Sequence, residues 1–358
     1  MSAAGAVAVR MANQGLATRP ASDPRSAALA CAGIQAQDLW ASQLAVRARS
    51  VHTTVSEVVH AAAEPSVVRS WLMRGTLHMV AAEDLRWLVD LIGPAVLKMA
   101  EPRFLEVGLT GQVRTAARAA LAGVLSGRRL TRAELVAALG AEVSGIPVQG
   151  QGPAHITIWA SASGLICRAG EQGKEPTYAL IDEFVPPAPP PPTDPMLELV
   201  GRYVRAFGPV TVEDFAPWSR LPVPAARRAF AGLDAELRAV TIDGRTHYVI
   251  GDVEPAHRVL RLLPAFDSYL MGYRGRDAFL DPRRRDAVAV GGILYPMIVV
   301  DGVIVGTWRL DRGRSPLRLR AEFFEPPARW ELAALDAEVA DVGRFLGRAP
   351  VQLHLGRR

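Results

Sequence analysis

The spacing of apolar and polar positions predicts an alternation of amphipathic helices and short β-hairpins along the chain. Apolar residues recur at helical intervals over 113–125, 154–160, 196–207, 223–233 and 328–346. Short apolar runs flank turns within 165–180 and 238–250, and the second turn is Asp243-Gly244, a pair typical of tight hairpins. Helices combined with antiparallel hairpins predict an α+β fold.

Three of the predicted helices begin with the same polar signature, a threonine followed three residues later by an acidic residue. In such a capping box each side chain bonds the backbone N–H of the other residue. The pairs begin 77 and 80 residues apart and are Thr54 with Glu57, Thr131 with Glu134, and Thr211 with Asp214. The second and third pairs are preceded by a helix and followed by a helix and a hairpin. This is the element order of a winged helix, so we expect three tandem winged-helix units.

The first unit is the least clearly marked of the three. Its hairpin is expected over 70–80 with the turn at Arg74-Gly75, and its third helix is expected to be short. Winged helices place a helix in a DNA groove and the wing on phosphates, although they also serve as protein–protein modules. Three copies in tandem favour a long, basic, concave surface.

The predicted organisation has five parts. Winged-helix units are assigned to 1–105, 106–185 and 196–255, with a proline-rich linker over 186–195 and a β-rich segment with a helix over 256–358. The prolines favour an extended spacer, and a peptide ligand for an aromatic groove is the alternative. In the last part, antiparallel strands are expected over 295–300, 302–310 and 317–325, with a turn at Asp301-Gly302 and a final strand over 351–355.

Composition indicates a globular protein. The chain has 358 residues, of which 49% are hydrophobic and 22% charged, and it has no apolar run near the roughly 20 residues that span a bilayer. The N-terminus lacks the charge order of a secretory signal. Cys31 and Cys167 match no metal or redox spacing. We therefore expect a cytoplasmic protein without metal, cofactor or membrane contact.

The net charge of +5 is carried almost wholly by arginine, because Lys98 and Lys174 are the only lysines. Arginine suits phosphate contacts, so the charge favours a polyanionic partner. The segment 261–276 mixes arginine with aromatic residues, as do surfaces that hold nucleic-acid backbones and unstacked bases. Alternatively, the acidic residues over 277–286 neutralise this segment as a solvated loop.

The run Gln35-Ala36-Gln37-Asp38 concentrates neutral amides after a helix that is expected to begin at Pro24 and to stop at Gly33. In an extended connector, residues two apart project to the same side. Two amides there can hold one water and present carbonyl dipoles to a developing positive charge. Alternatively, they tie down the backbone of a loop.

Two neighbouring polar residues have competing interpretations. Asp38 is either a general base or the cap of a helix over 39–49, and we favour the cap. His78 lies on an apolar hairpin beside Trp71, where it is either a core histidine or a residue that lines the site.

Several segments together resemble the winged-helix DNA glycosylases of the AlkZ/YcaQ type. They are 35–38, 69–78, 262–267, 272–276 and 300–309. The resemblance covers nearly the whole chain and implies tandem winged helices in a C shape around duplex DNA. It also implies excision of bulky N7-alkylated purines, including interstrand crosslinks. The AlkZ-like branch has a Gln-x-Gln motif, which maps onto Gln35 and Gln37, and Ala36 stands where a larger apolar residue is frequent.

The resemblance implies a chemistry that neutral amides can perform. An N7-alkylguanine is already cationic, so the barrier lies in forming and capturing a sugar oxocarbenium ion. We expect Gln37 to orient the attacking water and Gln35 to support the water or the cationic sugar. A lyase would need an amine, which only Lys98, Lys174 or the N-terminus offers, so monofunctional hydrolysis is expected.

The expected partner is double-stranded DNA that carries alkyl adducts, bound by a monomer. Arg74, Arg274 and Arg276 are the candidates for phosphate or minor-groove contacts. A role in self-resistance to a DNA-alkylating natural product is one expectation. The alternatives are a transcriptional regulator, which needs site preference on undamaged DNA, and a non-catalytic DNA-binding or protein-interaction module.

Overall fold

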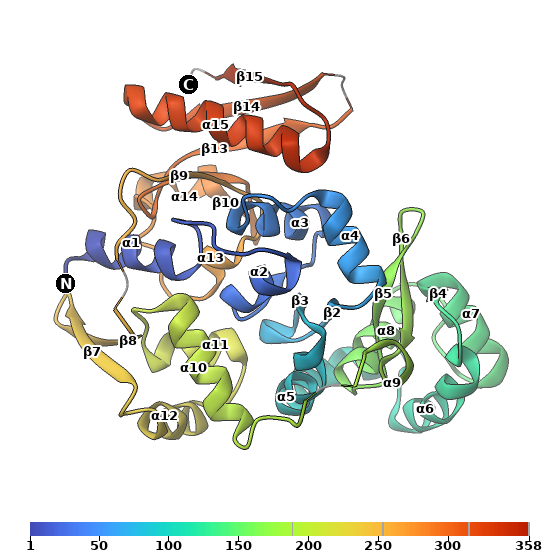
Figure 1. The fold of residues 1–358 in the computed structure, drawn as a ribbon. Coiled ribbons are helices and arrows are strands. Elements are labelled where there is room, and N and C mark those ends of the chain that lie inside the picture. The colour runs from blue at the N-terminus through green and yellow to red at the C-terminus, as the bar shows by residue number, and fades with distance from the viewer. Residues whose placement is uncertain (188, 253, 314–315, 357–358) are drawn as a thin grey trace. The chain divides into compact units, whose positions relative to one another are not determined.

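The computed structural model describes residues 1–187, 189–252, 254–313 and 316–356, and these form two compact units (Figure 1). The first unit combines Met1–Val58, Leu197–Trp218 and the chain from Pro222 onward. The second unit is built from Val59–Met196 and Ser219–Leu221. Each unit is described separately.

The second unit packs helices against an antiparallel sheet. Its helices are α4 (Val55–Ala63, which begins in the first unit), α5 (Leu85–Glu106), α6 (Gly111–Leu125), α7 (Arg132–Glu142), α8 (Gly152–Ala162) and α9 (Ile181–Phe184). Its strands are β2 (Val67–Trp71), β3 (Leu77–Ala81), β4 (Leu130–Thr131), β5 (Ile166–Gln172) and β6 (Glu175–Leu180), in the spatial order β3-β2-β5-β6-β4. Phe104, Leu121, Leu139, Ile156 and Trp159 lie in a contiguous apolar core between the helices and the sheet.

The first unit begins with α1 (Ala3–Asn13), α2 (Pro24–Ala30), β1 (Ile34–Gln35) and α3 (Leu39–Arg49). The chain returns to it as α10 (Pro195–Phe207), α11 (Val212–Ser219), α12 (Val223–Gly232) and the hairpin β7 (Leu237–Ile242) with β8 (Arg245–Ile250). Aromatic rings of α10 and α11 pack together, with Tyr203 stacked on Phe207 at 5.0 Å between ring centroids and tilted against Trp218 at 4.8 Å.

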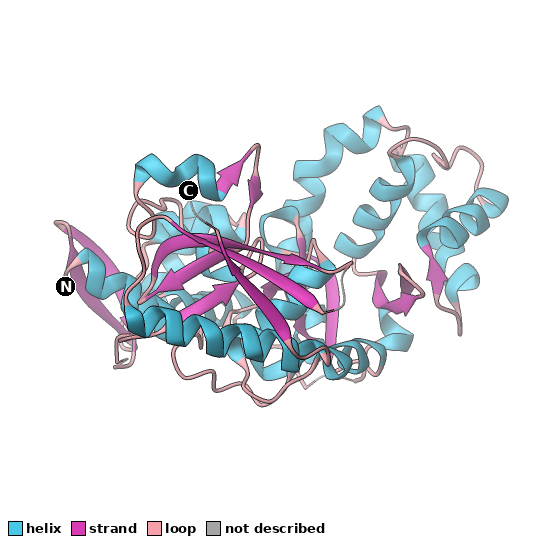
Figure 2. Cartoon of the chain, turned by 90° about the horizontal axis from the view of Figure 1, so that it is seen from above, coloured by secondary structure: helices cyan, strands magenta, loops and turns pink. Residues whose placement is uncertain are grey.

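A second sheet completes the first unit. Its strands are β9 (Leu260–Leu263), β12 (Met297–Val300), β13 (Val303–Asp311), β14 (Leu317–Phe323) and β15 (Val351–Leu355), in the order β15-β14-β13-β12-β9. Helix α15 (Arg329–Leu346) contacts β9 and β15 (Figure 2). The segment between β9 and β12 contains α13 (Ser268–Met271), a short 3-10 turn (Pro282–Arg284), α14 (Arg285–Val288) and the small hairpin β10 (Ala289–Val290) with β11 (Ile293–Leu294).

All three predicted capping boxes are confirmed. The backbone N–H of Thr54 bonds Glu57 at 2.6 Å. The backbone N–H of Thr131 bonds Glu134 at 2.8 Å, and that of Thr211 bonds Asp214 at 3.0 Å. In each box the acidic residue's N–H bonds the threonine hydroxyl in return.

The predicted turns are confirmed by their backbone angles. Asp243-Gly244 has φ values of 49° and 74°, Asp301-Gly302 has 47° and 91°, and Arg74-Gly75 has 57° and 69°. Positive φ at both central residues is the mark of the tight turn whose twist matches that of paired strands.

Some expectations for the elements are wrong. No helix lies between α4, which ends at Ala63, and β2, which begins at Val67, so the short third helix of the first winged-helix unit is absent there. Strand β15 pairs with β14 in parallel, and the C-terminal segment is therefore not wholly antiparallel. The reason is that α15 carries the chain back to the end of the sheet where β14 begins, as parallel pairing requires. Helices α1 and α5 and strand β9 are present in addition to the predicted elements.

The linker contains no helix or strand over 186–187 and 189–194, and α10 begins at Pro195. Ala188, within the predicted linker, lies outside the described residues. The five-part division and the C shape stay predictions. No helix among the described residues has the length and apolarity needed to cross a bilayer.

Candidate functional site

The helix that leads into the two glutamines, α2, ends at Ala30, three residues before the predicted stop at Gly33. Asp23 caps α2 by accepting the N–H of Ser26 at 2.7 Å, as expected. At the other end, the N–H of Gly33 bonds Ala28 O at 2.9 Å, and Ala32 has φ 49°. These bonds form a Schellman ending in which Ala32, not a glycine, takes the left-handed position. Gly33 then has φ 105° and turns the chain into β1.

The two glutamines lie in the connector between α2 and α3, as predicted, but only Gln35 is in an extended strand, whereas Gln37 lies at a bend. The two side chains also differ in exposure. Gln35 ends β1 and is 6% exposed, and Ala36 is fully buried. Gln37 follows β1 and is exposed. The segment therefore offers one amide at the surface and one that is nearly enclosed. A surface amide can meet a substrate directly, whereas an enclosed amide has an orientation fixed by its surroundings.

The helix after the motif has the predicted bounds, and its cap is Asp38. The carboxylate of Asp38 accepts the N–H of Ala41 at 3.0 Å at the start of α3. The cap interpretation of Asp38 is confirmed. Its negative charge lies at the positive end of the helix dipole, where it is stabilising.

The last turn of α3 carries two fully buried arginines. Arg49 donates to both carboxylate oxygens of Asp267 at 3.0 and 2.8 Å, and both side chains are inaccessible to solvent. Arg47 donates to Glu338 on α15 at 3.0 Å and to Leu262 O on β9 at 2.7 Å. Two buried guanidinium groups thus attach α3 to the C-terminal sheet, its helix and the segment that follows β9.

Residue 268 touches the glutamine segment directly. The hydroxyl of Ser268 donates to Gly33 O at 3.2 Å and accepts the N–H of Gln35 at 3.3 Å. Ser268 is 3% exposed and begins α13. The sequence does not predict this contact, because the partners are 233 residues apart and no local pattern marks a buried serine as a bridge.

The two tyrosines of 261–276 do not form a stacking surface for bases, and the third aromatic residue, Phe266, is half-buried. Tyr269 is fully buried and donates its hydroxyl to Gly302 O at 2.8 Å. Tyr273 is 8% exposed and donates to Phe207 O at 2.7 Å. Burial raises the pKa of both phenols above the ordinary value. These rings hold the fold together and are not presented to a ligand.

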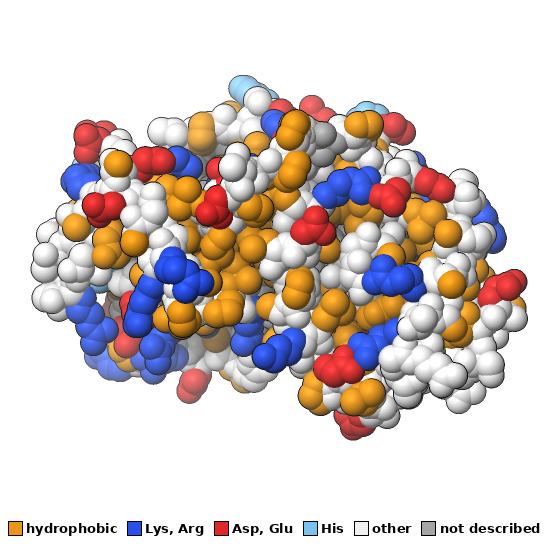
Figure 3. Space-filling view, turned by 90° about the horizontal axis from the view of Figure 1, so that it is seen from below, with side chains coloured by type: hydrophobic (Ala, Val, Ile, Leu, Met, Phe, Trp, Pro, Cys, Tyr) orange, Lys and Arg blue, Asp and Glu red, His pale blue; other side chains and the backbone are white. Residues whose placement is uncertain are grey.

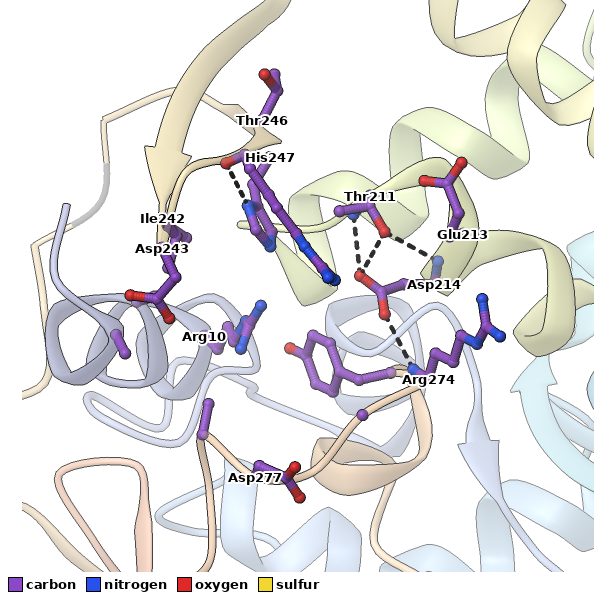
Figure 4. A pocket seen from close by; sticks show the side chains of 16 residues that line it. Arg10, Thr211, Glu213, Asp214, Ile242, Asp243, Thr246, His247, Arg274 and Asp277 are labelled. Carbon is purple, nitrogen blue, oxygen red and sulfur yellow. Dashed lines mark hydrogen bonds between the residues drawn. The ribbon is translucent and has the colours of Figure 1, made fainter.

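The two arginines predicted on this segment are exposed. Arg274 and Arg276 follow α13, and the backbone N–H of Arg274 bonds the carboxylate of Asp214 at 2.9 Å. Figure 4 shows Asp214 between Thr211 and Arg274, so the capping residue of α11 also fixes the arginine-bearing loop.

A pocket of about 1090 Å³ adjoins this loop within the first unit. Arg10 and Arg274 line it together with acidic residues that include Asp243 and Asp277 (Figure 4). Arg10 is committed to the fold, since it donates to Pro209 O at 2.8 Å and lies 4.5 Å from the ring centroid of Tyr273. The charged side chains that line the pocket are of both signs, so the pocket is not a dedicated anion site.

The remaining candidates lie in the second unit. His78 is 2% exposed with its Nδ1 3.1 Å from Thr76 O, and burial, with Arg74 nearby, lowers its pKa to about 3. The ring is therefore neutral near pH 7, as expected of a core histidine. Trp71 is half-buried opposite Leu77, and Arg74 is half-buried at the hairpin turn. Contact of these residues with a substrate stays a prediction.

The cysteines and surface charges add little chemistry. Cys31 and Cys167 are buried and free, and burial raises their pKa values to about 11 and about 12. The described residues contain no cluster of three or more side chains suited to a metal ion. On the face drawn in Figure 3, Arg and Lys side chains occur in small groups with acidic side chains among them.

The fold matches that of a known DNA-processing enzyme. The solved structure of the Streptomyces sahachiroi DNA glycosylase AlkZ is similar with a TM-score of 0.84 and 25% identity, over 99% of this chain and 100% of that one. The curated interstrand DNA cross-link repair glycosylase of the same organism is 28% identical over 342 residues, which are 90% of this chain and 91% of that protein. Fold and sequence together define an α+β protein of the DNA glycosylase class.

The family follows from the sequence itself. The profile described as DNA glycosylase AlkZ-like matches residues 28–345. The chain therefore belongs to the AlkZ-like DNA glycosylase family. The resemblance seen in its motifs is confirmed, and membership makes DNA the substrate.

Proposed function

We propose that the protein is a monofunctional glycosylase that hydrolyses the N-glycosidic bond of bulky N7-alkylated purines in duplex DNA, including interstrand crosslinks. The observation that carries the proposal is the Gln35-Ala36-Gln37 segment between β1 and α3 in a member of this family, with Gln37 exposed beside the start of α3. The name of the Streptomyces sahachiroi relative, an interstrand DNA cross-link repair glycosylase, supports the substrate class.

Uncharged amides suit the chemistry of such a substrate. An N7-alkylated guanine carries a positive charge and departs without further protonation. The transition state then places positive charge on the deoxyribose, which fixed carbonyl dipoles stabilise. Gln37 holds the attacking water through its amide oxygen, and that water loses its proton to solvent as the C1′–O bond forms. Gln35, which is 6% exposed, is assigned the second carbonyl dipole directed at the same centre.

The electrostatics of the helix that follows are compatible with this assignment. The N-terminus of α3 carries a partial positive charge, which opposes a cationic sugar nearby. The carboxylate of Asp38 lies at this terminus and offsets that charge. Asp38 thus acts as a cap that also makes the region more favourable for an oxocarbenium ion.

Hydrolysis is preferred over lyase chemistry, because the segment carries no amine. The chain has two lysines, and Lys98 and Lys174 lie on α5 and in the turn between β5 and β6 of the second unit. We assign DNA backbone contacts to the exposed Arg274 and Arg276 and to Arg74. The enzyme is proposed to act as a monomer without a cofactor, and self-resistance to a DNA-alkylating natural product is a proposed role.

A base-release assay tests this function. Purified protein is incubated with duplex DNA that contains an N7-alkylguanine, or a crosslink of two such bases, in the presence of a chelator. We expect release of the modified base and loss of at least ~100-fold in single-turnover rate for Gln37→Ala, because removing one preorganised dipole from a transition state costs about 10²–10³ in rate. Binding to the damaged duplex should change little.

The matched control is Gln112→Ala, which removes another exposed amide, on α6. This variant should release the base at the wild-type rate. Undiminished release by the double variant Gln35→Ala with Gln37→Ala would refute the assigned roles. Tight binding to one undamaged sequence without release would support a transcriptional regulator instead.

A further inference from the structure

We infer that Ser268 is a positioning residue for Gln35, held in place by the buried Asp267–Arg49 pair. The inference rests on the proposed function of the glutamine segment and adds residues that contact no substrate. The dipeptide Asp267-Ser268 makes hydrogen bonds to the chain at both ends of the Gln-x-Gln motif.

The serine fixes the strand that enters the motif. Its hydroxyl donates to Gly33 O at 3.2 Å and accepts the N–H of Gln35 at 3.3 Å. One hydroxyl thereby bonds two backbone groups two residues apart on one extended segment. These bonds define the position and rotation of the Gln35 backbone, and hence the direction in which its side chain leaves.

The aspartate fixes the helix that leaves the motif. Both carboxylate oxygens of Asp267 accept from Arg49, at the end of the helix whose first residue follows the Gln37-Asp38 pair. Arg49 has a second partner, Gln14 Oε1 at 2.9 Å. The arginine cannot turn away to solvent, because it is fully buried.

The local backbone makes the dipeptide a rigid unit. Asp267 also accepts the N–H of Tyr269 at 2.9 Å and thereby caps α13, which begins at Ser268. The preceding residue, Phe266, has φ 56°, a left-handed conformation that costs energy for a non-glycine residue. The serine hydroxyl is therefore presented from a fixed turn, and its hydrogen bonds to the glutamine segment have little freedom to shift.

The hydrogen bonds of Asp267 and Ser268, together called the clamp, should affect the rate of base release more than the affinity for DNA. Gln35 acts through the direction of its dipole, and displacements of about 1 Å at a catalytic centre can cost about 100-fold in rate. DNA is held by other residues, so loss of the clamp leaves affinity nearly unchanged. A merely structural hydrogen bond would instead alter stability without a selective effect on the chemical step.

The test compares Ser268→Ala with Ser268→Thr, which keeps the hydroxyl, and with Ser50→Ala. Ser50 is also fully buried, and its hydroxyl accepts the N–H of Thr53 at the opposite end of α3. Single-turnover base release, affinity for the damaged duplex and amide hydrogen exchange of Gln35 are measured for each. We expect Ser268→Ala to release base ~10–100-fold more slowly with affinity within about twofold, and to exchange the Gln35 amide faster.

The threonine variant should recover most of the rate, and Ser50→Ala should keep the wild-type rate and exchange. Unchanged release by Ser268→Ala, a threonine variant as slow as the alanine one, or an equal loss in Ser50→Ala would each overturn the inference. Failure of the proposed function looks different, because the wild type itself would then release no base. In that case unchanged exchange of the Gln35 amide in Ser268→Ala would overturn the clamp as well.

Discussion

Breaking the buried Asp267–Arg49 pair by removing the charge of one partner is expected to destabilise the first unit strongly, and Asp267→Asn tests this. The substitution keeps the size of the side chain but removes the charge that neutralises Arg49. It also replaces one of two accepting oxygens, at 3.0 and 2.8 Å from the guanidinium, with an amide that cannot accept. The remaining neutral partners of Arg49 include Gln14 Oε1 and Ala45 O.

Removing one partner of a buried ion pair costs about 3–5 kcal/mol, since the other charge is left uncompensated. In a unit of this size each kcal/mol lowers Tm by about 2–4 °C, so a shift of at least about 6 °C is expected. The matched control is Glu236→Gln. Glu236 bonds Arg205 at the same 2.8 Å, but both side chains are about half exposed, and such a pair contributes less than about 1 kcal/mol.

Stability is measured by thermal and urea unfolding, followed by the near-UV signal of the buried tyrosines around α13. A Tm for Asp267→Asn within 2 °C of that of Glu236→Gln, on the order of the error expected from surface substitutions, would refute the reasoning. The double variant Arg49→Met with Asp267→Leu should recover part of the loss, because it removes the unpaired charge. No recovery would show that packing around the pair, and not its charge, determines stability.

Two further predictions concern His78 and Gly302. The pKa of His78 falls from 6.5 to about 3 on burial, so the unfolded chain binds more protons than the folded protein between these pH values. The free energy of unfolding should therefore decrease by roughly 1 kcal/mol per pH unit as the pH falls through that window. Urea unfolding of His78→Leu should show a flatter dependence of stability on pH. Gly302→Ala should destabilise the protein more than Gly244→Ala does, by over ~1 kcal/mol. Both glycines have positive φ, but the Cβ added at Gly302 would lie 2.5 Å from the backbone oxygen of Val7, whereas the Cβ added at Gly244 would meet no atom within 4 Å. Equal melting temperatures for the two variants would contradict this.

Local signals were read correctly from the sequence, because the residues that make them are neighbours. The capping box at Thr131 needs only Glu134 three residues later, and the turn at Asp243-Gly244 needs only its own backbone preference. The position of Gln35 and Gln37 in a connector between two helices follows from the same kind of pattern, although Gln37 lies at a bend and not in the strand.

Interactions between distant segments could not be read in this way. Arg49 and Asp267 are 218 residues apart, and nothing near either shows that both charges are buried. The segment over 261–276 was interpreted from its composition, but its tyrosines turn inward and bond backbone carbonyls. The parallel pairing of β15 depends on how α15 returns the chain to the sheet, which periodicity does not specify.

The separation of Arg49 from its counter-ion has a consequence for biosynthesis. A ribosome makes the glutamine segment early and Asp267-Ser268 only after about three quarters of the chain has been synthesised. Segments made first can begin to fold during synthesis. Until then the first unit lacks its C-terminal sheet, and Arg49 has no counter-charge. A nascent or prematurely terminated chain can complete the second unit, nearly all of which is Val59–Met196, before Gln35 gains its bond to Ser268. If Ser268 positions Gln35 as inferred, incomplete products should release base more slowly than the whole chain.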